Sequence, residues 1–230
     1  KQVPAAEYNP IEAIKTNIYG AENITEAAID RGVQKIVALS TDKAVHPANL
    51  YGATKLVSDK LFISANAYVG NKDTSFSVVR YCNVAGSRGS VIPFFKRMIE
   101  EGAKELPITD VRMTRFWITL QQGIEMVVKA VKEANGGEIY VSKIPSFKIT
   151  DLADAMIPGA TIKEIGIREG EKLHEVMITE DDSRTTYEYD DSYIIYPNFD
   201  WWIMEKHFKP GGKKVEDGFR YSSDNNPVFF

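Results

Sequence analysis

The chain has 230 residues and a net charge of 28 − 32 = −4, so no broad basic surface indicates binding to nucleic acid. Hydrophobic residues make up 43% of it, which is typical of a soluble globular protein, and no apolar run approaches the roughly 20 residues of a membrane-spanning helix. The single cysteine, Cys82, excludes an internal disulfide and favours a reducing compartment. We therefore expect a cytoplasmic protein in which Cys82 is a small buried packing residue.

The first part of the chain alternates predicted helices with predicted strands. Asn9 and Pro10 favour a helix start, with Glu12 where a capping box wants an acid, and an apolar period of 3.6 residues continues this helix to about residue 31. The apolar run 33–39 predicts a buried strand, residues 50–68 a helix and residues 75–81 a second buried strand. This order predicts an α/β domain with a parallel sheet, which binds ligands beyond the carboxyl ends of its strands.

The second part of the chain is more mixed. Helices are expected over 90–102, 119–134 and 150–155, the last of them capped by Thr150. Short strands are expected over 106–109, 138–141 and 162–167. No spacing of His46, His174 or His207 with other ligands predicts a metal site.

Polar side chains follow the first predicted strand. Asp42 and Lys43 come directly after it, and Tyr51 and Lys55 lie one turn apart on the next helix. A phenol with a pKa of about 10 is a poor base, but a nearby ammonium favours the phenolate. The Tyr51–Lys55 pair could therefore remove a proton from a sugar hydroxyl while a hydride leaves the same carbon, although this spacing is also common on surfaces.

Asp42 and Lys43 allow two interpretations. They could form an ordinary ion pair in a loop, or they could act together as a general acid and a general base if the site separates their pKa values. The nearby Tyr51 and Lys55 favour the second interpretation.

Seven segments together resemble a known family. They are Ser40–Ala44, Leu50–Lys55, Arg80–Ser90, Met113–Thr119, Ile144–Leu152, Gly166–Glu175 and Tyr221–Ser223. They are similar to the extended short-chain dehydrogenase/reductase superfamily, and most closely to the inverting UDP-N-acetylglucosamine 4,6-dehydratases that start bacterial pseudaminic acid synthesis. The resemblance covers nearly the whole chain. Tyr51 stands where the membrane-anchored, configuration-retaining relatives usually have Met, which favours the inverting branch.

The resemblance implies a mechanism. Tyr51, assisted by Lys55, would take the O4 proton while NADP+ accepts the C4 hydride. Lys43 would then be the base at C5, and Asp42 the acid for the departing C6 hydroxyl. Return of the hydride to C6 and protonation of C5 from the opposite face would give UDP-2-acetamido-2,6-dideoxy-β-L-arabino-hex-4-ulose.

The resemblance also implies binding residues and an assembly. The implied cofactor contacts are Tyr51, Lys55, Val84 and Lys1, and the implied substrate contacts are Asn83, Arg88, Arg115, Arg168, Glu171 and Lys1. Arg115 and Arg168 would hold the UDP diphosphate, for which a forked guanidinium is suited. The family tends to form homo-oligomers, often hexamers, and we expect the same here.

The chain departs from the family in two respects. The glycine-rich turn that holds the dinucleotide pyrophosphate does not occur in it, so we expect these residues to be part of a longer chain and to bind NADP poorly alone. Cys82 stands where relatives usually have Gly. We expect residues 1–89 to form the second half of a Rossmann-like doubly wound parallel sheet, and residues 90–230 to form mainly a smaller mixed α/β substrate domain, with segments around 112–135 returning to the first.

Two alternatives remain open. A UDP-N-acetylhexosamine 4-epimerase would use Tyr51, Lys55 and the arginines, but would not need Asp42 and Lys43 for elimination. A non-catalytic nucleotide-sugar-binding scaffold is the other, and the intact set of four polar residues argues against it.

Overall fold

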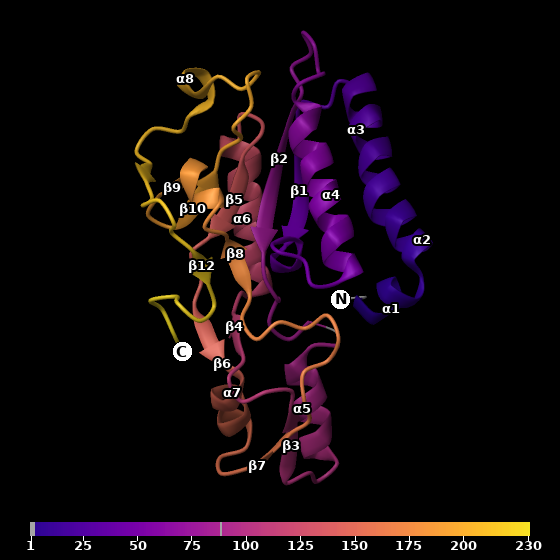
Figure 1. Cartoon of the computed structure of the whole chain (residues 1–230), viewed down its shortest axis with the longest axis vertical. Helices are drawn as coiled ribbons and strands as arrows, with labels where there is room; N and C mark the ends of the chain where they lie inside the picture. Colours follow the sequence, from indigo (N-terminus) through magenta and orange to yellow (C-terminus); the bar gives the residue numbers. More distant parts are fainter. Residues whose placement is uncertain (1–2, 88) are drawn as a thin grey trace.

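One mixed sheet organises the protein (Figure 1), whose computed structural model describes residues 3–87 and 89–230. Strand β1 (Lys35–Thr41) pairs in parallel with β2 (Ser75–Tyr81), and β2 pairs in parallel with β5 (Ile139–Ser142). Beyond β5 the pairing becomes antiparallel, through β10 (Ser192–Ile195), β9 (Thr186–Glu188) and β11 (Lys213–Lys214). The predicted α/β class and parallel Rossmann-like half are confirmed, whereas the antiparallel half was not predicted.

Helices cover both faces of the parallel half. Because side chains alternate along a strand, Phe76 and Val78 face one side of β2 and Val79 faces the other. Phe76 and Val78 share a core with α4 (Leu50–Ala65) and α3 (Gly20–Asp30). Val79 packs instead with α6 (Leu120–Glu133). This double cover explains why β2 is buried along most of its length.

The predicted first helix is divided into several elements. It comprises α2 (Pro10–Ile14), a π-helical turn (Lys15–Tyr19) and α3, and a short helix that was not predicted, α1 (Val3–Tyr8), precedes it. Pro10 does stand in the first turn of α2, but the predicted cap is wrong, because the Asn9 amide donates backwards to the carbonyl of Ala5 at 3.0 Å. The predicted cap at Thr150 is wrong as well, since α7 (Ile149–Met156) begins one residue earlier, after Lys148.

A second group of elements lies at one end of the sheet (Figure 1). Strand β3 (Glu105–Ile108) pairs with β7 (Thr161–Glu164), and β4 (Thr114–Phe116) pairs with β6 (Ser146–Lys148). Helices α5 (Val91–Glu100) and α7 share a core with β3 that is centred on Phe95, Leu106 and Phe147.

The remaining strands, helix and turns are short. Strand β8 (Val176–Ile178) pairs with β12 (Tyr221–Ser222), and α8 (Met204–His207) and short 3-10 turns at Asp42–Ala44 and Asp182–Thr185 complete the list. Cys82 is buried among Val141, Met177 and Tyr221, as expected for a packing residue. None of the helices in the described ranges is long and apolar enough to cross a membrane.

Candidate active site

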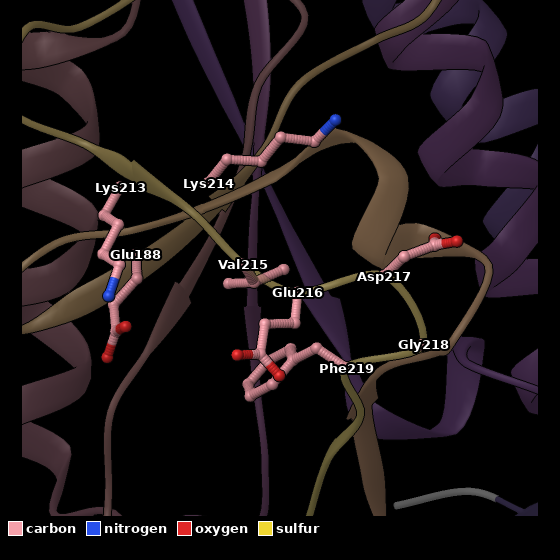
Figure 2. A pocket seen from close by; sticks show the side chains of 8 residues that line it. All are labelled: Glu188, Lys213, Lys214, Val215, Glu216, Asp217, Gly218 and Phe219. Atoms are coloured by element: carbon pink, nitrogen blue, oxygen red, sulfur yellow. The ribbon is translucent and has the colours of Figure 1, made fainter.

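A pocket of about 360 Å³ lies along β11 and the turn that follows it (Figure 2). Its lining residues are Glu188 and residues 213–219. None of these residues is among those that the sequence analysis singles out. Both acidic and basic side chains line the pocket. The site that the sequence predicts lies elsewhere, at the carboxyl ends of β1 and β2.

The ends of these two strands bring together the first expected residues. The Lys43 ammonium donates to Asp42 Oδ1 at 3.1 Å and to Asn83 Oδ1 at 3.2 Å. Thr41 fixes the turn, because its hydroxyl accepts from the Lys43 backbone and donates to Asp42 Oδ1. Asp42 is fully buried, and its Oδ2 has no hydrogen-bond partner within the described part of the chain. The structure thus places a buried acid and a mostly buried amine in direct contact.

Helix α4 approaches this turn closely because of Gly52. A Cβ at Gly52 would lie 2.1 Å from the carbonyl oxygen of Lys43. The side chain of Asn49 caps the helix by accepting from the Gly52 amide at 2.8 Å, and its amide group donates to the carbonyl of Gly170 at 2.9 Å. Asn49 and Gly52 therefore fix the distances between three segments, a role that the sequence analysis did not assign to them.

Tyr51 and Lys55 lie on the same helix but have different environments. Burial raises the pKa of Tyr51 above its ordinary value, and the nearby Lys43 ammonium opposes that shift. The Lys55 ammonium donates to the carbonyl of Leu39 at 2.8 Å, and burial lowers its pKa. In this structure Lys43 is therefore a cation that favours the Tyr51 phenolate, while Lys55 is held against β1.

Glu175, a buried carboxylate that the sequence analysis did not single out, completes the cluster. Glu175 Oε1 lies 3.9 Å from Lys43 Nζ and 3.7 Å from Arg115 Nε. Burial would lower the pKa of Lys43, but Asp42 and Glu175 outweigh it and raise that pKa. Glu175 stands at the end of the 166–175 segment, and its position in that motif was the one available sequence signal.

Arg115 is engaged with the protein itself. One terminal nitrogen donates to the carbonyls of Thr114 and Leu173 at 2.7 and 2.9 Å. The other donates to the carbonyl of Lys172 at 3.0 Å and to the sulfur of Met113 at 3.3 Å. The guanidinium therefore holds the 166–175 segment against β4, and a diphosphate would have to replace some of these acceptors.

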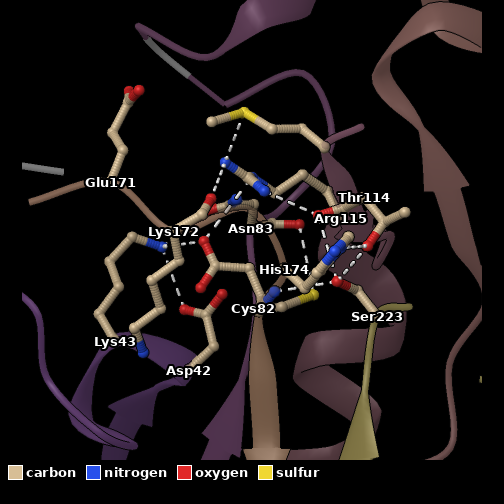
Figure 3. Close-up of polar contacts among 12 residues, drawn as sticks. Asp42, Lys43, Cys82, Asn83, Thr114, Arg115, Glu171, Lys172, His174 and Ser223 are labelled. Atoms are coloured by element: carbon tan, nitrogen blue, oxygen red, sulfur yellow. Dashed lines mark hydrogen bonds and ion pairs between the residues drawn. The ribbon is translucent and has the colours of Figure 1, made fainter. Parts of the chain in front are cut away.

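The other expected contacts lie outside the buried cluster. Arg168 is exposed, and Glu171 points away from the cluster (Figure 3). Val84 forms an isolated bridge to Ile118. Two expected residues, Lys1 and Arg88, lie outside the described residues. Across residues 3–87 and 89–230, no group of three or more His, Cys, Asp or Glu side chains could hold a metal ion.

The two hydrogen bonds of the Asn49 side chain, to the Gly52 amide and to the Gly170 carbonyl, give a first prediction. Asn49→Asp keeps an acceptor for the Gly52 amide but removes the donor to Gly170, whereas Asn49→Ala removes both. We expect the Ala variant to lose about 1 kcal/mol of stability as a lost helix cap and the Asp variant to lose less. Both should show faster amide hydrogen exchange across residues 166–175. Unchanged exchange in that segment in both variants would show that Asn49 does not hold residues 166–175 against α4.

Comparisons with known proteins identify relatives of the whole chain. Residues 1–197 match a family described as polysaccharide biosynthesis protein. The chain is 58% identical over 234 residues to a UDP-N-acetylglucosamine 4,6-dehydratase (inverting) of Campylobacter jejuni, with 100% of this chain and 70% of that protein covered. It is 42% identical over 229 residues to a UDP-glucose 4-epimerase of Rickettsia canadensis, with 98% of this chain and 67% of that protein covered. The X-ray structure of Pen from Bacillus thuringiensis has a TM-score of 0.86 at 39% identity, covering 99% of this chain and 68% of that one.

Proposed function

We propose, because the chain belongs to the polysaccharide biosynthesis protein family, that it contributes the acid–base residues of an inverting UDP-N-acetylglucosamine 4,6-dehydratase. One observation carries the proposal: Asp42 and Lys43 are in direct contact, 3.1 Å apart, and both side chains are mostly buried. Elimination of water needs an acid and a base together, whereas exchange of configuration at C4 does not. The identity to the Campylobacter relative supports the same activity.

The Asp42–Lys43 pair can reach its working form without exchanging protons with water. The ammonium of Lys43 is favoured at rest, because two carboxylates raise its pKa. Transfer of one proton from Lys43 to Asp42 gives a neutral amine, which can act as a base, and a carboxylic acid, which can act as an acid. The two groups then behave as a coupled pair that holds one proton between them.

The chain's own residues would carry the following proton transfers. Tyr51, as a phenolate, takes the proton of the sugar O4. The Lys43 amine removes the proton from C5, whose electron pair is stabilised by the C4 ketone. Asp42 gives its proton to the C6 hydroxyl, which leaves as water, and C5 receives a solvent-derived proton on the opposite face when the hydride returns to C6. A bound nicotinamide dinucleotide would supply the hydride acceptor for C4 and return the hydride to C6.

The residues present fit the nicotinamide end of such a cofactor. Tyr51 and Lys55 lie at the carboxyl end of β1, and Val84 follows β2. Leu39, whose carbonyl holds Lys55, is 46% exposed on the unpaired edge of β1, so apolar surface is accessible there. We propose NADP, held by these three residues and by Lys1.

We propose substrate contacts on the side of the cluster away from the sheet. Asn83 faces Lys43 and would bind the sugar. Arg168 and Glu171 would bind from the 166–175 segment. Arg115 would bind the diphosphate if it exchanges some of its protein acceptors, and Arg88 remains an expectation from the resemblance.

Incubation with UDP-N-acetylglucosamine tests the proposal. The polypeptide should also carry the expected glycine-rich turn, and the product is analysed by mass spectrometry. Loss of one water is the expected result. An unchanged mass with a galacto product would instead identify the 4-epimerase, which the Rickettsia relative makes the second candidate, and no conversion with retained binding would identify a scaffold.

Two finer parts of the proposal have their own measurements. Inversion at C5 predicts that the product formed in deuterium oxide carries deuterium at C5 and has the L-arabino configuration by NMR, as a pseudaminic acid precursor requires. We also propose a homo-oligomer, a hexamer by the resemblance, and light scattering would measure its mass.

A further inference from the structure

Glu175 is held in place by two distant segments of the chain. The Ser223 backbone amide donates to the Glu175 carbonyl at 2.8 Å, and the Glu175 amide donates to Ser223 Oγ at 2.9 Å. Ser223 is itself bonded to the hydroxyl of Thr114 at 2.7 Å. The backbone of Glu175 is therefore fixed between β4 and the C-terminal residues, immediately before β8.

The carboxylate of Glu175 lies between two cations. Its Oε1 faces both Lys43 and Arg115, at 3.9 and 3.7 Å, and the residue is only 5% exposed. Its Oε2 has no hydrogen-bond partner among residues 3–87 and 89–230. Burying a carboxylate costs free energy unless the charge is paired. The two cations pair one oxygen of Glu175, and the oxygen without a hydrogen-bond partner calls for an explanation beyond stability.

The two cations are held by different kinds of acceptor. The terminal nitrogens of Arg115 donate hydrogen bonds to backbone carbonyls and to a sulfur. Within residues 3–87 and 89–230, the Lys43 ammonium donates to side chains, those of Asp42 and Asn83. Glu175 and Arg115 therefore lie beside the Lys43 ammonium as a pair, in which hydrogen bonds to the protein hold Arg115 in place.

Charged groups on the neighbouring elements act on Lys43 and Glu175. Those that act on Lys43 or Glu175 are Asp42, Arg115 and Lys172, and Tyr51 and Cys82 also interact with Lys43. Burial and the charge of Asp42 raise the pKa of Glu175, while the three cations oppose that shift. In a low-dielectric site, one carboxylate at this distance has a strong effect on the charge of its neighbour.

We propose that Glu175 is a positioning residue for the elimination, which holds Lys43 toward the C5 position and stabilises the positive charge that Lys43 gains there. This inference rests on the proposed function. In the step concerned, the C5–H bond breaks, an N–H bond forms on Lys43, and the electron pair remains on C5, in conjugation with the C4 ketone. Glu175 itself exchanges no proton with the substrate.

Glu175→Gln tests the inference in the polypeptide with its dinucleotide bound. The single-turnover rate of water loss should fall about tenfold to a hundredfold, with little change in KM. Without the Glu175 charge, the Asp42–Lys43 pair holds its shared proton less tightly, so the alkaline limb of the rate profile should move to lower pH. Glu175→Asp keeps a charge, and it should restore part of the rate and leave the alkaline limb near its wild-type position.

A matched control separates this role from a structural one. Glu188 is a partly exposed carboxylate that pairs with Lys143 at 2.7 Å, away from the site, and Glu188→Gln should change neither the rate nor its pH profile. A purely structural role for Glu175 would lower the melting temperature and leave the alkaline limb in place, which would overturn the inference. If wild-type protein removes no water, the proposed function fails instead, so the two failures are distinguishable.

Discussion

Lys43→Arg is expected to fold normally and to lose water elimination by about 10³-fold or more. The arginine keeps a positive charge facing Asp42 and Glu175, which lie 3.1 and 3.9 Å from the lysine nitrogen. A guanidinium cannot be deprotonated in proteins, so it cannot serve as a base. The loss would therefore report the chemistry of Lys43 and not the removal of an ion pair. The measurements are the mass-based assay and thermal unfolding.

A partial reaction sharpens this test. Oxidation at C4 needs Tyr51 as the base and a positive charge beside it, which the arginine keeps, so reduced nicotinamide should accumulate in the variant and be visible by its absorbance. Lys60→Arg, on an exposed position of α4, is the matched control and should behave as wild type. Water elimination at the wild-type rate by Lys43→Arg would show that another residue is the base at C5.

The fold could be predicted where one local pattern decides the structure. Strand β2 occupies Ser75–Tyr81, the range expected from its apolar run, because both of its faces are covered by helices. Strands β9 and β11 could not be predicted in the same way. They have three and two residues, and only their pairing with distant segments makes them strands.

Local signals also failed where tertiary contacts compete with them. Asn9 has the right residue type for a cap, but its amide finds an acceptor in the preceding helix α1, whose existence was not predicted. Thr150 likewise lies inside the first turn of α7, since the helix starts directly at the end of β6. The helix or capping propensity of a single residue is therefore weak evidence for where a helix begins.

In the candidate site, too, some residues could be predicted from the sequence and others could not. Asp42, Lys43 and Asn83 could be expected together, because the carboxyl ends of adjacent parallel strands meet at one edge of a sheet. Glu175 could not, because its place beside Lys43 depends on how the 166–175 segment returns to that edge. The internal bonding of Arg115 depends on the same return and was equally invisible in the sequence.

Gly52→Ala is expected to destabilise the protein by about 1–3 kcal/mol, as overpacking does, and to lower activity far more than stability suggests. The new Cβ would lie 2.1 Å from the carbonyl oxygen and 3.0 Å from the carbonyl carbon of Lys43. Both are backbone atoms, so either α4 or the Asp42–Lys43 turn must move. A displacement of about 1 Å in a catalytic group can lower the rate about a hundredfold, and here it separates Tyr51 from Lys43.

Gly123→Ala provides the matched control, because Gly123 lies within α6 and a Cβ there would meet nothing within 4 Å. Replacing a glycine in a helix by alanine at such a position should stabilise the protein by about 0.5–1 kcal/mol and leave the rate unchanged. Melting temperatures and turnover of the two variants measure the contrast. Equal, near-wild-type turnover in both would mean that the close contact between α4 and the Asp42–Lys43 turn is not needed for catalysis. Opposite changes in stability, with loss of turnover in Gly52→Ala alone, would identify this contact as the feature that sets the geometry of the acid–base pair.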